Sequence, residues 1–244
     1  MEVQVHQRGR NYRYFNFVMV GFVTVLLCSN LIGPGKTIPL EFSLFGLDID
    51  TSFGAGNLFF PIGYIFGDIL TEVYGFARAR LVIWAGFGAM IFASIMSFVV
   101  INMPADPAEP FNTQLQPALE LVFGGTWRIV LGSMLAFWVG DFVNSYVLAR
   151  MKVITQGRYL WARTIGSTFV GQGVDSLIFY PFAFYGVWET STLVSVVIFN
   201  WLFKVAVEVV FTPLTYVVVG FLKRHEDEDF YDQGTDFTPF SLKT

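Results

Sequence analysis

The sequence is poor in the residues on which most enzymes and soluble domains depend. Only 14% of its 244 residues are charged, against about a quarter in a soluble domain. A single cysteine, Cys28, excludes an internal disulfide and a cysteine-rich metal site. Both histidines, His6 and His225, lie in polar terminal segments, so the apolar segments lack the usual general base and the commonest metal ligand. We therefore expect neither an enzyme nor a metal or cofactor site.

Apolar residues make up 54% of the chain and aromatic residues 18%. A membrane helix needs about 20 mostly apolar residues to cross about 30 Å of hydrocarbon. Runs of this kind occupy residues 14–32, 51–74, 80–102, 127–149, 160–187 and 192–222. We predict an all-α integral membrane protein with one six-helix domain, residues 1–222. The N-terminus lacks the pattern of a cleaved signal peptide, so the first span is expected to stay.

The positive charges indicate the orientation of these spans. Lysine and arginine concentrate in the segments that six spans would place on one side, namely Arg8, Arg10 and Arg13, then Arg78 and Arg80, then Arg150, Lys152, Arg158 and Arg163, then Lys223 and Arg224. The segments on the other side carry mostly Asp and Glu, with little positive charge besides Lys36. The positive-inside rule then predicts that both termini are cytoplasmic.

Acidic residues concentrate in the C-terminal tail, residues 223–244, which includes HEDEDFYDQGTDFTPF. Its composition is typical of a solvated cytoplasmic segment. The net charge of −4 reflects this tail, and no basic stripe indicates a nucleic-acid partner.

Two connections have patterns of their own. The alternation in KTIPLEFSLFGLDID between the first two spans predicts a short external β-hairpin. Four prolines between residues 103 and 117 favour a surface loop over a helix.

Small residues spaced by four, among them Gly132, Ala136 and Gly140, let helices approach closely. They favour packing within one bundle, and a homodimer face is the alternative.

Polar residues recur at helical spacing inside four predicted spans. The sets, each on one helical face, are Asp68 with Glu72, Asp141 with Asn144, Gln172 with Asp175, and Asn200 with Lys204 and Glu208. Ionisable groups inside a membrane are costly, so we expect several of them to meet near the midplane around a water-filled cavity or in a pairing network.

Some of these groups also have purely structural interpretations. Lys204 and Glu208 are four residues apart and could neutralise one another. Asp68 and Glu72 precede Arg78 and Arg80 and could form an ion pair at the cytoplasmic interface. Gln172 and Asp175 have no basic residue within one turn, which favours a function. A carboxylate beside an amide complements a guanine-like edge, but it also suits a cationic metabolite, a proton relay or an ion path.

Four long motifs, in order along nearly the whole chain, carry a family resemblance. They are FPIGYIFGDILTEVYG with ARARLVIWAGF, FWVGDFVNSYVLARMK, LWARTIGSTFVGQGVDSLIF, and the C-terminal TPLTYVVVGFLKRHEDEDFYD…TDFTPF. Together they resemble the bacterial queuosine precursor transporters, a family earlier labelled vitamin uptake transporters. The resemblance implies a multi-pass inner-membrane importer of 7-cyano-7-deazaguanine or 7-aminomethyl-7-deazaguanine, which are salvaged for tRNA modification.

The resemblance also implies roles, which we state as hypotheses. Asp175 and Gln172 grip the base, Asn144 and Asp141 complete the site, and Asp68 with Glu72 gate the cytoplasmic side. Lys204, Glu208 and Asn200 join the substrate-binding set. The six-helix pattern is also similar to the substrate-binding subunits of energy-coupling-factor importers, but the first span has no Ala-rich docking motif for such a module. The alternative function is a transporter or binding subunit for another small vitamin or cofactor.

Overall fold

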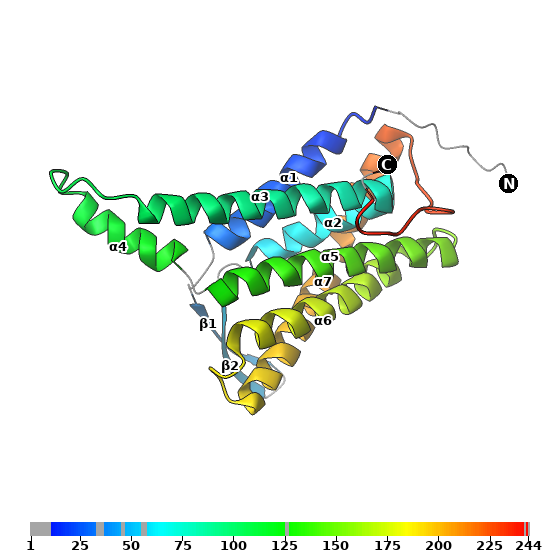
Figure 1. Cartoon of the computed structure of the whole chain (residues 1–244). Coiled ribbons are helices and arrows are strands. Elements are labelled where there is room, and N and C mark those ends of the chain that lie inside the picture. Colours follow the sequence, from blue (N-terminus) through cyan, green and yellow to red (C-terminus); the bar gives the residue numbers. More distant parts are fainter. Residues whose placement is uncertain are drawn as a thin grey trace.

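The computed structural model describes residues 11–32, 37–44, 47–54, 58–124, 127–241 and 243. This part of the chain is mainly helical, with one pair of strands (Figure 1). In chain order the elements are α1 (Phe15–Leu31), β1 (Thr37–Leu44), β2 (Leu47–Gly54), α2 (Phe60–Tyr74), α3 (Phe76–Asn102), α4 (Asn112–Phe123), α5 (Trp127–Ile154), α6 (Leu160–Phe184) and α7 (Thr190–Glu226).

Three of the described helices, α3, α5 and α7, are long and apolar enough to cross a membrane. Helix α1 is apolar but has 17 residues, and α2 has 15, which at 1.5 Å per residue is about 26 Å and about 22 Å. Helix α6 has 25 residues but carries Arg163, Gln172 and Asp175. The protein is a helical membrane protein, and the count of six spans stays a prediction.

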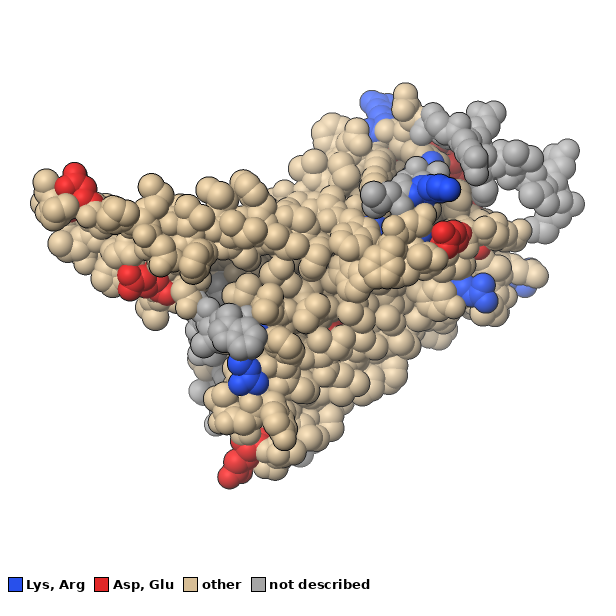
Figure 2. Space-filling model, in the orientation of Figure 1, with Lys and Arg blue, Asp and Glu red and all other residues tan. Residues whose placement is uncertain are grey.

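The helices converge at one end of the molecule and diverge at the other (Figure 1). Helix α5 packs on α6, α6 on α7, and α2 on both α1 and α7. The first and last described segments meet at the converging end, where the Tyr12 hydroxyl donates to Glu228 at 2.6 Å and the Tyr14 amide to Glu226 at 2.7 Å. On the face in Figure 2, charged side chains gather toward the ends and leave a broad band with few of them between.

Two glycines set the closest approach of α5 and α6. A Cβ added at Gly171 would lie 2.7 Å from the Cβ of Asn144 and 3.0 Å from the Gly140 carbonyl oxygen, and one at Gly140 would lie 3.0 Å from the Cβ of Asp175. Any side chain would therefore push the helices apart. This crossing places the polar residues of α5 beside those of α6.

Helix α2 begins at Phe60, so the span predicted to begin at residue 51 was wrong at its start. Residues 51–54 belong instead to β2, where Thr51 pairs with Leu40 and Gly54 with Thr37 in antiparallel register. The backbone hydrogen bonds of this segment are thus made between strands. Gly75 separates α2 from α3 with a φ of 85°, a conformation that favours glycine.

The loop predicted for residues 103–117 was wrong over its last part. Helix α4 begins at Asn112 and contains Pro117, which removes one helical hydrogen bond. The side chain of Gln116 offsets this loss, because its amide donates to the Ile101 carbonyl at 2.9 Å and to Glu120 at 2.7 Å. Helix α4 is thereby anchored to the end of α3.

The C-terminal tail is not the solvated segment that its composition predicts. Its acidic residues Glu228 and Asp232 are buried. The Asp232 carboxylate accepts from the Phe76 amide at 3.1 Å, which satisfies a free N–H group at the start of α3. The Arg80 guanidinium donates to tail carbonyl groups at 2.6–2.7 Å, as does the Trp84 indole to Pro239. The tail therefore forms part of the fold.

Replacing Gly171 with alanine tests the crossing of α5 and α6. We expect Gly171→Ala to lower the free energy of unfolding by about 1–3 kcal/mol, because the added methyl group overlaps Asn144 and Gly140. Melting in detergent, followed by size-exclusion chromatography, should show a decrease of several degrees. Gly88→Ala on α3 is the matched control, since a Cβ there meets nothing within 4 Å. Equal melting of wild type and Gly171→Ala would contradict the close approach.

Candidate functional site

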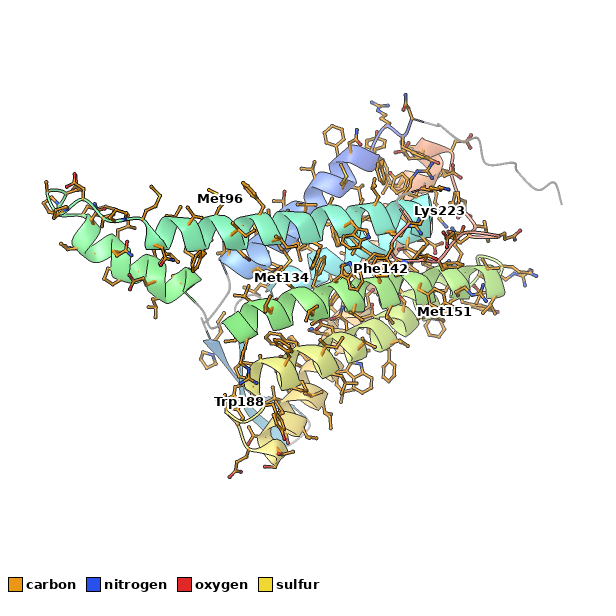
Figure 3. All side chains as sticks on the ribbon, viewed as in Figure 1. Met96, Met134, Phe142, Met151, Trp188 and Lys223 are labelled. Atoms are coloured by element: carbon orange, nitrogen blue, oxygen red, sulfur yellow. The ribbon has the colours of Figure 1, made fainter. Side chains whose placement is uncertain are left out.

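A cavity of about 1120 Å³ lies between the helices and reaches the end where they diverge. Its outer part is lined by residues near the ends of α3, α5 and α6, among them Ile101, Ile129 and Phe184. Toward the converging end the bundle is filled by side chains such as Val73 and Leu148, both 0% exposed. The cavity is therefore open at one end and closed at the other. Trp188 lies at the open end and Lys223 at the closed end (Figure 3).

Five of the residues singled out in the sequence line this cavity together. They are Asp141 and Asn144 from α5, Gln172 and Asp175 from α6, and Lys204 from α7. The glycine crossing of α5 and α6 brings the first four together, and the packing of α7 on α6 adds the fifth. The expected meeting of polar groups around a cavity is thus present for these five.

Lys204 and Asp175 form an ion pair across α7 and α6, with 2.5 Å between the ammonium nitrogen and a carboxylate oxygen. The charge of Asp175 is therefore already balanced within the protein. This pair differs from the neutralisation of Lys204 by Glu208 on one helix that the sequence spacing allowed. The oxygens of Glu208 have no hydrogen-bond partner in the described part of the chain.

Asp141 and Gln172 are available to a ligand. They line the cavity, and no hydrogen bond or ion pair within the described residues occupies their side chains. A carboxylate accepts hydrogen bonds, and an amide both donates and accepts. Together they can bind a polar ligand that carries N–H donors beside a carbonyl acceptor.

Aromatic rings form one wall of the cavity beyond these polar groups. Phe179, Tyr180, Phe184 and Trp188 all line it. The rings of Phe184 and Trp188 stack with 3.9 Å between their centroids and 3° between their planes. Phe179 packs edge-on against Tyr180, with 5.0 Å between the centroids. Such a wall suits a flat, partly apolar ligand.

Four of the predicted residues do not line the cavity, namely Asn200, Asp68, Glu208 and Glu72. Asn200 donates to the Val196 carbonyl of its own helix at 3.0 Å. Asp68 and Glu208 are 0% and 1% exposed and lie within hydrogen-bonding reach of one another. Asp68 also lies beside Asn144, which does line the cavity. The carboxyl groups of Asp68 and Glu208 therefore lie in the packed interior of the bundle, next to the wall of the cavity.

Glu72 lies at the closed end, in an ion network that joins four helices. Its carboxylate is 0% exposed and lies 2.8 Å from Arg163, 2.6 Å from Lys223 and 3.5 Å from Lys152. The structural alternative for Glu72, an ion pair with Arg78 or Arg80, is replaced by these three partners. Gly75 turns the chain before α3, so Arg78 donates to the Tyr74 carbonyl instead, and Arg80 to the tail.

The tail supplies a second carboxylate to this network. Asp229 lies 2.5 Å from Lys152 and 2.7 Å from Lys223. Burial favours the protonated acid, but the two ammonium groups outweigh it and hold the pKa of Asp229 below its ordinary value. Asp229 is therefore ionised at neutral pH and holds the tail on the bundle.

The sequence interpretation missed some polar groups that line the cavity. Tyr64 lies one turn before Asp68 on the same face of α2, a spacing that could have identified it. Asn30 of α1 accepts a hydrogen bond from the Ser133 hydroxyl of α5 at 3.1 Å. Asn30 belongs to no helical repeat of ionisable residues, so no periodic pattern drew attention to it.

A bundle of apolar helices around a cavity that holds a cluster of polar side chains, open at one end and closed by ion pairs at the other, is the arrangement of a membrane transporter. Residues 54–218 match the family described as "Putative vitamin uptake transporter". The chain belongs to this family.

Relatives of known name agree with this assignment. The chain is 33% identical over 212 residues to the "Probable queuosine precursor transporter" of Bacillus subtilis (strain 168), covering 86% of each chain. It is 23% identical to the "Queuosine precursor transporter" of Escherichia coli (strain K12), covering 93% of this chain and 96% of the relative. No solved structure matches the chain.

The substitution Glu72→Gln tests whether the ion network around Glu72 stabilises the closed end of the bundle. The change keeps the side-chain volume but leaves Arg163 and its neighbouring lysines short of negative charge. We expect a loss of about 3–5 kcal/mol in stability, because a buried ion pair broken on one side leaves uncompensated charge. Yield and melting temperature in detergent are the measurements. Glu189→Gln is the control, since Glu189 is exposed. A Glu72→Gln protein as stable as wild type would contradict a structural role for the network.

Proposed function

We propose that this chain imports a queuosine precursor, 7-cyano-7-deazaguanine or 7-aminomethyl-7-deazaguanine, across the inner membrane of a bacterium. The names of the Bacillus subtilis and Escherichia coli relatives support this cargo. The observation that carries the proposal is the pairing of a carboxylate with an amide, Asp141 with Gln172, in a cavity that has an aromatic wall.

The geometry fits a deazaguanine in the following way. Asp141 accepts hydrogen bonds from the ring N–H and the amino group of the base, and the Gln172 amide donates to its carbonyl oxygen. Tyr180 or Phe179 covers one face of the ring. Asp175 acts through Lys204, because the two form an ion pair. The base is therefore bound chiefly by Asp141, with Asp175 holding the shape of the site.

The transport cycle we propose is alternating access across six spans with both termini in the cytoplasm. The meeting of the first and last described segments at one end of the bundle supports the second point. The cavity is open on the side opposite to these segments, so this conformation faces outward. Opening on the other side requires the helices around Glu72 to separate, which gives Glu72 a part in gating besides its role in stability.

Queuosine in tRNA is the readout that tests this function. The chain is expressed in a bacterium that neither makes queuosine precursors nor has its own importer, and each base is supplied at low concentration. We expect wild type to restore queuosine. Asp141→Asn and Gln172→Ala should lower uptake about 10- to 100-fold, because each removes a hydrogen bond to the base of about 1.5–3 kcal/mol.

The controls separate the site from the fold. Asn200→Ala removes a polar residue from α7 that the cavity does not use, and it should transport like wild type. Membrane levels of every variant are measured by immunoblot. Normal uptake by Asp141→Asn would overturn the site. If wild type reaches the membrane and restores nothing with either base, the cargo is wrong and another small vitamin or cofactor takes its place.

A further inference from the structure

Two carboxyl groups, Asp68 of α2 and Glu208 of α7, face each other inside the bundle. They are 0% and 1% exposed and lie within hydrogen-bonding reach of one another. Their four oxygens make no close hydrogen bond to a donor in the described part of the chain, and the Asn144 amide is the donor that lies beside Asp68. Two ionised carboxylates can only accept, so a bond between them requires a proton on one. Two like charges this close in a buried site cannot both be present.

The described cations closest to this pair have other carboxylates as partners. Lys204, one turn from Glu208, is bound to Asp175, and the cations nearest to Glu72 are bound to that carboxylate and to Asp229. The other ionisable groups on the helices packed around the pair are acidic or neutral, namely Tyr64 and Glu72 on α2, Asp141 on α5 and Asp175 on α6. Within their spans, α1 and the middle of α3 contribute no charge. A proton can therefore balance the charge of the pair.

Asn144 connects this pair to the cavity. It is 9% exposed, lines the cavity and lies beside Asp68, and its side-chain oxygen has no hydrogen-bond partner among the described residues. Gly67, which precedes Asp68, also lines the cavity, as does Lys204. The pair thus adjoins the proposed substrate site, and the cavity gives it a route from the open side.

We propose that Asp68 and Glu208 form a proton site that couples substrate import to the inward movement of a proton. A proton from external water enters through the cavity, binds one carboxylate oxygen and is held in a hydrogen bond to the other carboxyl group. It leaves to cytoplasmic water after the bundle opens on that side, because water then reaches both carboxylates and both can carry a charge. No other bond forms or breaks. One positive charge moves inward with each neutral base.

The test uses the purified full chain in liposomes with radiolabelled 7-cyano-7-deazaguanine. It rests on the proposed function, so two measurements are made in parallel. Exchange of labelled for unlabelled base at equal pH on both sides reports transport alone. Accumulation is measured with the interior one pH unit more alkaline. One coupled proton should accumulate the base up to about tenfold, and a proton ionophore should abolish this.

The variants Asp68→Asn and Glu208→Gln are expected to exchange the base but to accumulate none of it, because the pair can no longer take up and release a proton. Asp106→Asn in the exposed loop before α4 is the control and should accumulate like wild type. Size-exclusion chromatography identifies variants that do not fold. Accumulation by the wild-type protein under the pH gradient tests the proposal even if neither variant folds.

The outcomes are distinguishable. If wild type does not exchange the base, the proposed function fails. If wild type exchanges it but shows no accumulation under a pH gradient, the proton site is overturned and the proposed function stands. If accumulation follows a sodium gradient at equal pH and is lost when choline replaces sodium, the pair binds sodium and the proton proposal is likewise overturned.

Discussion

The carboxylate of Glu72 is shared by cations from three helices, Lys152 of α5, Arg163 of α6 and Lys223 of α7. Each of these charges alone would be costly away from water. Together they tie the converging ends of the bundle and account for the docking of the tail, since Asp229 supplies further negative charge. With that end closed, the only described route into the large cavity is at the diverging end.

The charged groups of this protein fall into two sets, which differ in the partners that they bind. Those around Glu72 are bound to one another and to backbone groups, which is what a structural network requires. Around the cavity, Asp175 and Lys204 form an ion pair, but Asp141 and Gln172 are available to a ligand, and Asp68 faces another acid. Four carboxyl groups and one ammonium group meet in the middle of the bundle. Such an excess of carboxyl groups is expected at a site that binds a ligand and a cation. It is not expected in a protein with a purely structural role.

The sequence predicted the class of fold, a close helix approach at Gly140 and five of the cavity residues, because helical spacing and the cost of buried charge are local signals. It failed where partners are distant in the chain. The composition of the tail could not reveal that Asp232 satisfies the start of α3, nor that Arg80 binds tail carbonyl groups. The start of α2 was missed because residues 51–54, Thr-Ser-Phe-Gly, carry no charge and are compatible with the end of a strand or the start of a span, and only pairing with β1 decides between them.

The contacts of the tail bear on the order in which the protein is made. Residues 227–243 leave the ribosome after all the helices, yet they provide the carbonyl groups that Arg80 binds and the carboxylate that Lys152 binds. During synthesis, Arg80 and Lys152 therefore lack these partners until the tail has been made. The bundle is therefore completed only after these residues have been translated, and a chain truncated before them leaves Arg80 and Lys152 without these partners.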